Sequence, residues 1–225
     1  MNKLELVCRL RRECGVTGAD PTSLTNQPEE INRLTDWINA AWVDIQSQRE
    51  DWLWMRAPFS FATTNGQVSY TATDCGITDF GNWADDAFRN HVTASGTNSE
   101  IFMDYWSYEN WRDVYYFGAN RQVYARPMVI CITPDKQLAM GPIAASGYTV
   151  TGGYFKLPAE LDTDSATPSL PAQFHMAIVY RAMMFYGAFE AAQEVYSGGQ
   201  TEFKNMMGKI NMQQRHHLGF GGPLA

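Results

Sequence analysis

The chain has no long apolar run, no closely paired cysteines and few charges, and each of these absences excludes a class of protein. No uninterrupted run of about 18 apolar residues occurs, so the sequence predicts no transmembrane helix. The four cysteines (Cys8, Cys14, Cys75 and Cys131) contain no Cys-x-x-Cys pair, which argues against a zinc site or a disulfide framework. Residues 1–14 interleave charges with apolar side chains and no apolar signal core follows, which indicates a helix rather than a signal peptide and folding in a cytoplasm.

Basic residues are in the minority. The chain has 24 acidic and 17 basic residues, a formal charge of -7, so the overall phosphate neutralisation that dominates tight DNA binding is not expected. Charged residues make up only 18% of the chain against 45% hydrophobic residues, which favours a surface partly covered by partners. Aromatic residues make up 13%, as expected either for a generous aromatic core or for protein interfaces, whose centres are rich in large rings.

Ready-made catalytic and nucleotide-binding motifs are also missing from the sequence. There is no GxSxG, no Walker A loop, no GxGxxG after a strand and no HExxH. His91 falls in a predicted loop, and the adjacent His216 and His217 would point apart on a helix, so no metal site is expected. His175 lies in an apolar segment, which favours a hydrogen-bonded core or interface histidine over a catalytic base.

Local structure accounts for the paired carboxylates. A helix N-terminus favours acidic residues, and aspartates in a Ser/Thr/Pro-rich linker solvate it and fix turns. The sequence therefore predicts no enzyme, no catalytic residue, no cofactor and no metal ligand. A carbohydrate-processing or carbohydrate-binding module, with tryptophan and two carboxylates in a cleft, stays as an alternative. The pairs are Glu29 with Glu30, Asp85 with Asp86, and Asp162 with Asp164.

Helical periodicity marks the start of the chain. Apolar residues recur at helical spacing over residues 2–14, and Gly15 follows as a helix-ending residue. Pro28 and the acidic residues after it open a second helix, whose apolar spacing continues to Trp54. If the helix continues through Trp52 to Trp54, it spans about 27 residues and is roughly 40 Å long at 1.5 Å per residue.

The end of the chain is also predicted to be helical. Residues 172–196 are apolar on nearly all sides, as in a helix that packs against several neighbours. Gly198-Gly199 is expected to break this helix, and Thr201 to cap a last amphipathic helix that ends near Arg215. Before it, the Asp-, Thr- and Pro-rich segment 158–171 is predicted to be a linker.

The middle of the chain follows the period of strands. Phe59 and Phe61 alternate before Asn65-Gly66, and Val68 and Tyr70 alternate after it, which predicts a hairpin. Loops around short elements are expected from 72 to 100, and further strands at residues 100–105, 123–133, 137–140 and 148–157. Two local features complete the pattern: Ser107 is predicted to cap a short helix, and Gly152-Gly153 to form a bulge or a close backbone approach.

These patterns predict an α+β fold in which N- and C-terminal helices form a helical bundle with an inserted β-rich subdomain. The expected segments are 1–57, the N-terminal helices; 58–158, the β-rich insertion; and 159–225, the C-terminal helices and tail.

Five segments together resemble the head-to-tail adaptor (connector) proteins of tailed bacteriophages, of the short-tailed phage type. They are MNKLELVCRLRRECGVTG at the start, YENWRDVYYFG from Tyr108, RPMVICITPDKQLAMGP from Arg126, YTVTGGYFKLPAELDTDSATPSLP from Tyr148, and FHMAIVYRAMMFYGAFEAAQE from Phe174. What matches is a pattern of hydrophobic, proline and glycine positions that covers most of the chain and contains no catalytic residue.

The resemblance implies a virion structural protein at the head-tail interface, made in the host bacterial cytoplasm. It implies a homo-oligomeric ring, a dodecamer, beneath the portal protein. The ring would extend the DNA channel, let DNA pass without specific binding, and present a platform for the tail or nozzle protein, with no membrane involved. A tail-tube or neck completion protein that does not contact the portal is the alternative within the same class.

In related adaptors the C-terminal arm reaches toward the portal. The resemblance therefore implies a portal-docking tail with anchors among its last ten residues, and a frayed terminus is the alternative. The expected partner-binding residues are His216, His217, Leu218, Phe220 and Leu224.

Overall fold

The computed structural model describes residues 1–214, with the side chain of Asp86 excepted. The chain forms two compact units, one built from Met1–Trp54 and Pro158–Ala225 and the other from Met55–Leu157. The first, called the helical unit below, contains four long helices from both chain ends, and the second, the β unit, contains all the strands of the described residues. The predicted α+β fold, with helices from both ends and a β-rich insertion, is confirmed.

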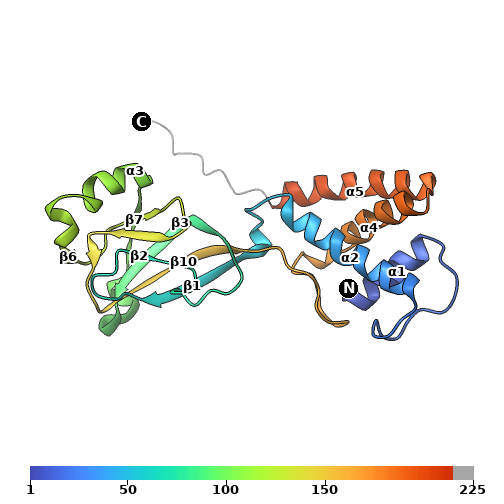
Figure 1. Ribbon diagram of the computed structural model, residues 1–225, viewed down its shortest axis with the longest axis horizontal. Helices are drawn as coiled ribbons and strands as arrows, with labels where there is room; N and C mark the ends of the chain where they lie inside the picture. Colours follow the sequence, from blue (N-terminus) through green and yellow to red (C-terminus); the bar gives the residue numbers. More distant parts are fainter. Residues whose placement is uncertain (215–225) are drawn as a thin grey trace. The chain divides into compact units, whose positions relative to one another are not determined.

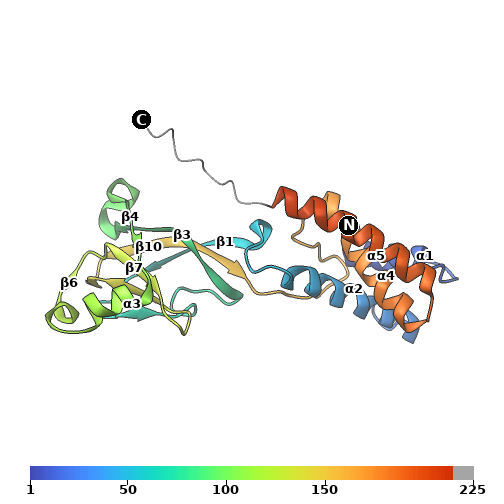
Figure 2. The same cartoon turned by 90° about the horizontal axis from the view of Figure 1, so that it is seen from above.

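The helical unit is a bundle in which one helix contacts all the others. Both α1 and α2 pack against α4, and α4 also packs along α5; the last two helices run side by side in Figures 1 and 2. Burial of their apolar faces holds the bundle together, because the side chains at these contacts are almost fully removed from water. The helices are α1 (Lys3–Glu13), α2 (Glu29–Ser47), α4 (Met176–Phe189) and α5 (Gln193–Gln213), with a short 3-10 turn at Ala172–Phe174 before α4.

The first helix lies within the predicted range of residues 2–14. Asn2 and Glu5 form a reciprocal capping box at the N-terminus, and Arg11 and Arg12 in the last turn both pair with one carboxylate. Gly15 follows the C-cap with φ +69°, a conformation that glycine adopts without steric cost.

The second helix is shorter than predicted. It ends at Ser47, so the continuation to Trp54 that the apolar spacing suggested does not occur. After the helix end the chain turns back, and the Trp52 indole N–H donates to the carbonyl of Ile45, which also accepts the backbone N–H of the C-cap residue Gln48. Trp52 is fully buried there and its ring stacks on Trp54 at 5.4 Å between centroids. The apolar spacing that suggested more helix instead fills the end of the bundle.

The break between the two C-terminal helices lies before the glycine pair. The chain turns at residues 190–192, where Ala191 has φ +52°, and α5 then runs without interruption through Gly198-Gly199. Both the predicted break at these glycines and the predicted capping role of Thr201 were therefore wrong. Thr201 lies inside α5, where its hydroxyl donates to the carbonyl of Ser197.

Glycine serves a packing function between α4 and α5. A Cβ on Gly187 would lie 2.7 Å from the backbone nitrogen of Tyr196, and one on Gly199 would lie 2.9 Å from the carbonyl oxygen of Tyr180. The two helices approach so closely that neither position has room for a side chain.

The predicted linker is closely bound to the helical unit. The Lys3 ammonium donates to the carbonyl of Leu161, and the Asp164 carboxylate accepts from the Ser23 hydroxyl and the Leu24 N–H. Carbonyls of the same linker also accept the first backbone N–H groups of α1. Although this segment contains no helix or strand, it supplies the hydrogen-bond acceptors that the first N–H groups of α1 need.

The β unit contains two four-stranded sheets and one two-stranded sheet. Figures 1 and 2 show β1, β10 and β3 side by side, and all pairs in this first sheet are antiparallel. The first sheet has the order β1 (Arg56–Ala62), β10 (Tyr148–Lys156), β3 (Phe80–Val92) and β4 (Ile101–Phe102). The second has the order β2 (Ser69–Tyr70), β8 (Leu138–Gly141), β7 (Val129–Ile132) and β5 (Asp104–Tyr105), and the third pairs β6 (Tyr124–Ala125) with β9 (Ile143–Ala144).

Large rings dominate the core of the β unit. Phe59 is the centre of this cluster, with ring contacts to Phe61, Trp83 and Phe88. Beside it, Gly152 leaves the room that two of these rings occupy, since a Cβ there would lie 2.8 Å from Phe59 and from Phe88. The register of β10 against β3 shifts at this point, as predicted for Gly152-Gly153.

Three predictions for the middle of the chain were wrong. Residues 59–70 form no hairpin, because β1 pairs with β10 and β2 pairs with β8 in the other sheet. The expected loops of 72–100 contain β3, thirteen residues long, whose polar residues hide its period. Residues 100–105 form two short strands, β4 and β5, that belong to different sheets.

Other predictions for this region are confirmed. The Ser107 side chain accepts from the N–H of Asn110 and caps α3 (Tyr108–Trp111), which continues as a π-helical turn at Arg112–Tyr116. Strands occur within each of the predicted ranges 123–133, 137–140 and 148–157. Short 3-10 segments at Leu53–Met55, Thr93–Ser99 and Ala119–Gln122 complete the described elements.

Candidate interaction surfaces

The four cysteines are unsuited to nucleophilic chemistry. Burial raises the pKa of the Cys14, Cys75 and Cys131 thiols to about 12, and it also raises that of Cys8. The thiolate is the reactive form, and these shifts keep the thiols protonated at neutral pH. Across residues 1–214, no group of three or more His, Cys, Asp or Glu side chains is placed to hold a metal ion. No helix in the same range is long and apolar enough to cross a bilayer.

His175 is a hydrogen-bonded core histidine, as its sequence context predicts. Its ring is buried, with Nδ1 2.7 Å from the Met1 ammonium and Nε2 2.8 Å from the carbonyl oxygen of Leu170. An ammonium can only donate and a carbonyl can only accept, so the ring is the neutral tautomer with its proton on Nε2. Burial lowers the pKa of His175, which favours this neutral form.

The remaining sequence candidates do not converge on a site. Within the described range, His91 and Asp85 lie on β3, Glu29 and Glu30 on the first turn of α2, and Asp162 and Asp164 in the 158–171 segment. The side chain of Asp86 is not described. The predicted partner-binding residues His216, His217, Leu218, Phe220 and Leu224 lie outside the described residues, and their docking role stays a prediction.

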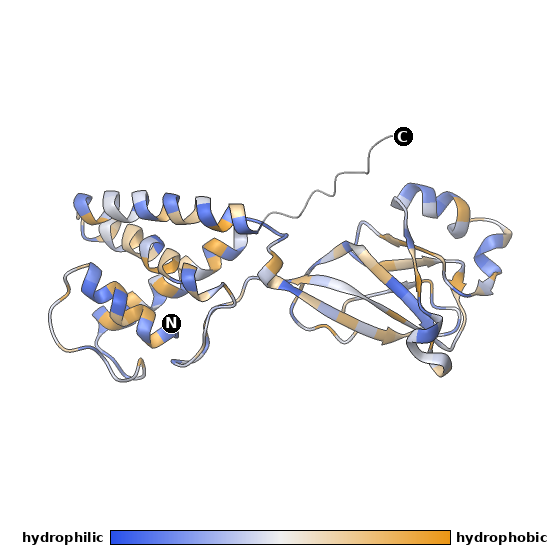
Figure 3. Cartoon of the chain, turned by 180° about the vertical axis from the view of Figure 1, so that it is seen from behind, coloured by the Kyte–Doolittle hydropathy of each residue, from blue (hydrophilic) through white to orange (hydrophobic). Residues whose placement is uncertain are grey.

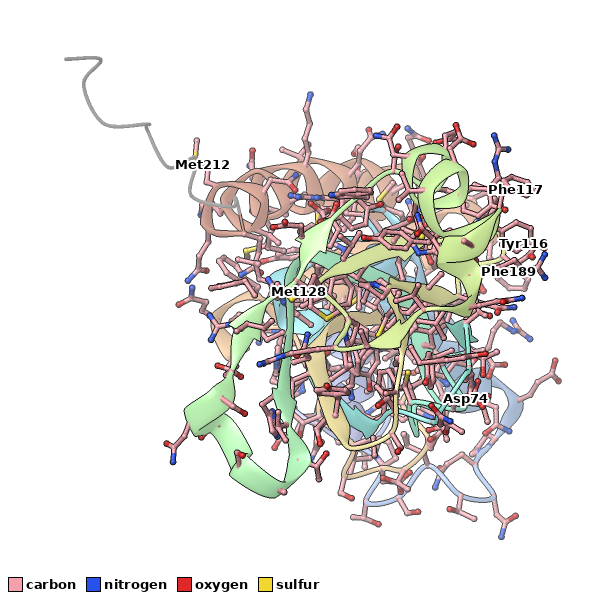
Figure 4. The ribbon with its side chains drawn as sticks, turned by 90° about the vertical axis from the view of Figure 1, so that its left-hand side faces the viewer. Asp74, Tyr116, Phe117, Met128, Phe189 and Met212 are labelled. Carbon is pink, nitrogen blue, oxygen red and sulfur yellow. The ribbon has the colours of Figure 1, made fainter. Side chains whose placement is uncertain are left out.

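The β unit carries an exposed apolar segment, residues 107–125, which we call the aromatic arm. Its base is fixed, because Trp111 is 2% exposed and packs against β7 and β8. Tyr115 also lies against Gly141, where a Cβ would come within 2.4 Å of the tyrosine ring. Beyond this base, five large apolar side chains are exposed, and Tyr116 and Phe117 are labelled in Figure 4. They are Val114, Tyr116, Phe117, Val123 and Tyr124.

A pocket of about 320 Å³ lies between the aromatic arm and the edge of the second and third sheets. Tyrosine and aliphatic side chains line it together with polar groups, and it contains one cation, Arg121, which pairs with no carboxylate in residues 1–214. Monomeric proteins seldom leave large rings gathered in this way, and the centres of protein interfaces are rich in tyrosine, phenylalanine and arginine. The aromatic arm is therefore a candidate protein-binding surface.

The helical unit has a different kind of surface, a groove between α2 and α4 of about 610 Å³ that we call the α2–α4 groove. Inside it, Arg181 makes a two-pronged ion pair with Asp44, at 3.0 and 3.3 Å, and its guanidinium lies 4.8 Å from the Phe185 ring centre. The other charges in the groove are negative. Its lining consists of Asp36, Asn39, Ala40, Val43, Asp44 and Ser47 of α2, Glu160, and Arg181 and Phe185 of α4.

Sequence reasoning missed this groove. The α2 residues that line it recur three and four positions apart, so they form a small and polar stripe beside the apolar stripe that predicts the helix. Such a stripe also describes an ordinary solvated helix face. Only the packing of α4 beside it makes it the wall of a groove.

Comparison with known protein families gives one match over the full length. The family model described as SU10 adaptor protein matches residues 1–225. No curated protein matches the chain.

Proposed function

Because the chain belongs to the SU10 adaptor protein family, we propose that it is the structural head-to-tail adaptor of a tailed phage virion. In this proposal it forms a ring beneath the portal protein, extends the DNA channel and provides the platform to which the tail attaches. The observation that carries the proposal is the family match over the whole chain. The exposed aromatic arm supports a role in assembly.

The proposed roles of the two units differ. The helical segments 1–57 and 159–225 would build the ring wall and dock the portal, while the β-rich segment 58–158 would contact neighbours or the tail. The aromatic arm supports the second role, because it offers exposed rings on a base that is already packed. A ring of twelve copies is the expected assembly.

The charge balance supports the proposed channel. With a net charge of -7 the chain has no general affinity for phosphates, as a channel that lets DNA pass without holding it requires. In the proposal, synthesis takes place in the host cytoplasm and the mature location is the head-tail interface of the virion.

Electron microscopy of the purified full chain, mixed with purified portal, tests the proposal. A ring of protein density attached to one face of the portal is expected. Mixing the chain with tails that lack portal is the control that separates a portal adaptor from a tail-tube or neck completion protein. Binding to tails alone would contradict the adaptor role, and a virion without any copy of the protein would overturn the whole proposal.

The proposed portal-docking tail has its own test. A chain truncated after Arg215 lacks the predicted anchors Leu218, Phe220 and Leu224 and should bind the portal more weakly. Circular dichroism of the truncated chain controls for folding. Unchanged portal attachment would eliminate the docking role of the tail and leave the adaptor role to be judged by the first experiment.

A further inference from the structure

The pocket beside the aromatic arm offers hydrogen-bond donors without a matching carboxylate. Among the described residues that line it, Arg121 is the only charged one, and Gln122 and the tyrosines at positions 115, 116 and 124 supply further donors. The polar groups of these side chains make no hydrogen bond or ion pair within residues 1–214. Arg121 and Gln122 are exposed, so another molecule can reach them. Because a guanidinium carries only donors, the pocket is complementary to an anion.

The walls of this pocket are fixed by contacts within the β unit. Tyr124 lies on β6, which pairs with β9, and its ring lies against Gly66, where a Cβ would be 3.3 Å from a ring carbon. Tyr115 is held against β8. The Asn120 amide donates to the carbonyl of Val114 at 3.0 Å and ties the two halves of the arm together. A ligand that enters a pocket with its walls already in place loses less free energy to ordering.

The charge of the pocket favours a carboxylate over the phosphates of DNA. A guanidinium and a carboxylate form a planar, bidentate pair, so one arginine can satisfy one carboxylate. Binding to DNA takes several phosphate contacts from lysine and arginine, and the pocket contains a single cation in a chain of net charge -7. The ligand that fits is therefore an acidic side chain of a protein.

Apolar side chains surround the cation. Val68 and Ile143 line the pocket with it, and Phe117 packs against the lining residue Tyr116 at 5.2 Å between ring centroids. Figure 3 shows hydrophobic and hydrophilic residues side by side along the arm. Arginine and tyrosine together are typical of the residues that carry most of the binding energy in protein interfaces. A carboxylate with a large apolar neighbour would use both parts of this surface.

We propose that this pocket binds an aspartate or glutamate side chain of the tail protein, with Arg121 as its ion-pair partner and with an apolar neighbour of that carboxylate packed on Tyr116 and Phe117. The inference rests on the proposed platform and names the chemistry of its contact. A pocket of about 320 Å³ takes a small number of side chains, which fits a local anchor for a partner that joins later better than the broad surface between permanent neighbours.

Short blocked peptides test the pocket on the full chain, without portal or tail. Acetyl-Leu-Asp-Phe-amide should bind about five times more tightly than acetyl-Leu-Asn-Phe-amide, because only the aspartate completes the ion pair. Arg121→Gln should remove this preference. Arg112→Gln is the matched control and should keep it, because Arg112 lies on the same arm outside the pocket and pairs with Asp113. NMR titration measures both affinities, and circular dichroism shows that each variant folds.

Tail attachment tests the source of the carboxylate. When portals that carry the adaptor ring are mixed with purified tails, Arg121→Gln should leave the rings intact and lower the fraction of portals with a tail about fivefold, as counted by electron microscopy. Arg112→Gln should attach tails like the parent chain.

The remaining outcomes separate this proposal from the proposed function. Equal affinity of the two peptides for the parent chain, or no binding of either, would overturn the carboxylate specificity of the pocket. Loss of rings in Arg121→Gln would identify a second copy as the partner, loss of portal attachment would identify the portal, and unchanged tail attachment would exclude the tail; each would overturn the assignment to the tail. Failure of the parent chain to form any ring would instead contradict the proposed function, and the peptide result would still stand.

Discussion

The two units of the chain expose opposite kinds of surface. The helical unit presents carboxylates and unpaired lysines, while the β unit presents tyrosine, phenylalanine and valine on the aromatic arm. Contacts of the first kind weaken as salt screens the charges, whereas burial of apolar rings persists in salt. Salt would therefore weaken contacts made by the first surface more than contacts made by the second.

The largest expected effect on the free energy of unfolding comes from adding a side chain at a closely packed glycine instead of an open one. Gly187→Ala should lower the free energy of unfolding by about 2 kcal/mol, because its Cβ would overlap the backbone of α5, which cannot move aside as a side chain can. Gly208→Ala, at an open position, should raise it by up to about 1 kcal/mol. Urea unfolding followed by circular dichroism measures both changes. Equal stability of the two variants would contradict the close crossing of α4 and α5.

The linker is the next place to test how the helical unit is held together. Asp164→Ala should lower the free energy of unfolding by about 1 to 2 kcal/mol, because the Ser23 hydroxyl and the Leu24 N–H lose a charged acceptor. Asp162→Ala is the matched control, since this exposed carboxylate has no partner in residues 1–214 and should change stability by under about 0.5 kcal/mol. A linker that did not take part in the fold would give the same small effect for both variants, as measured by urea unfolding.

Acid should lower the stability of the helical unit through His175. Its pKa is lowered in the folded chain, so the unfolded chain binds the proton more readily and protonation favours unfolding. The stability that the neutral ring contributes is fully present above the unfolded pKa of about 6.5, and is lost as pH falls from there toward the lower folded pKa.

The advantage of the parent chain over His175→Gln should therefore shrink below about pH 6.5, by at most about 1.4 kcal/mol per pH unit. Urea unfolding at a series of pH values between about 5 and 7.5 measures it. A difference that did not change with pH would show that His175 keeps its ordinary pKa in the folded chain.

The smallest effect on stability is expected on the aromatic arm. Phe117→Ser and its control Phe102→Ser, which replaces another exposed phenylalanine of the β unit, should each change the free energy of unfolding by less than about 0.5 kcal/mol. Only Phe117→Ser should reduce the number of tails that attach to portals carrying the adaptor, and added salt should not deepen the loss. Equal tail attachment by both variants would remove the arm from the proposed platform.

Much of the helical unit could be predicted because its signals are local. The helix-ending Gly15, the acidic first turn of α2 and the apolar periods identify the helices wherever they pack. The errors came from residues with two possible uses. Trp52 and Trp54 continue an apolar period but fold back over the helix end, and Gly199 is a helix breaker in isolation but a contact point beside α4.

The β unit was less predictable because its pairing is not local. Phe59 pairs with Gly152, and no turn signal near either residue shows this. The period of β3 is obscured because Asn82 and Asn90 alternate irregularly with its aromatic residues, and a bulge shifts the register beside them. Of the candidate sites, the aromatic arm was suggested by the high aromatic content of the chain, but composition does not show which rings are exposed. The α2–α4 groove depends on the packing of α4 beside α2, which the sequence of α2 does not show.

The helical unit is built from two separate stretches of the chain, with the β unit between them, and this has a consequence for synthesis. Residues 55–157 form one continuous segment, whereas α1 and α2 gain their main partner, α4, only when residues 176–189 have been made. At about 5–20 residues per second, the ribosome needs roughly 6 to 26 s to pass from the end of α2 to the start of α4. The β unit can fold during this delay, before α4 becomes available to the two N-terminal helices.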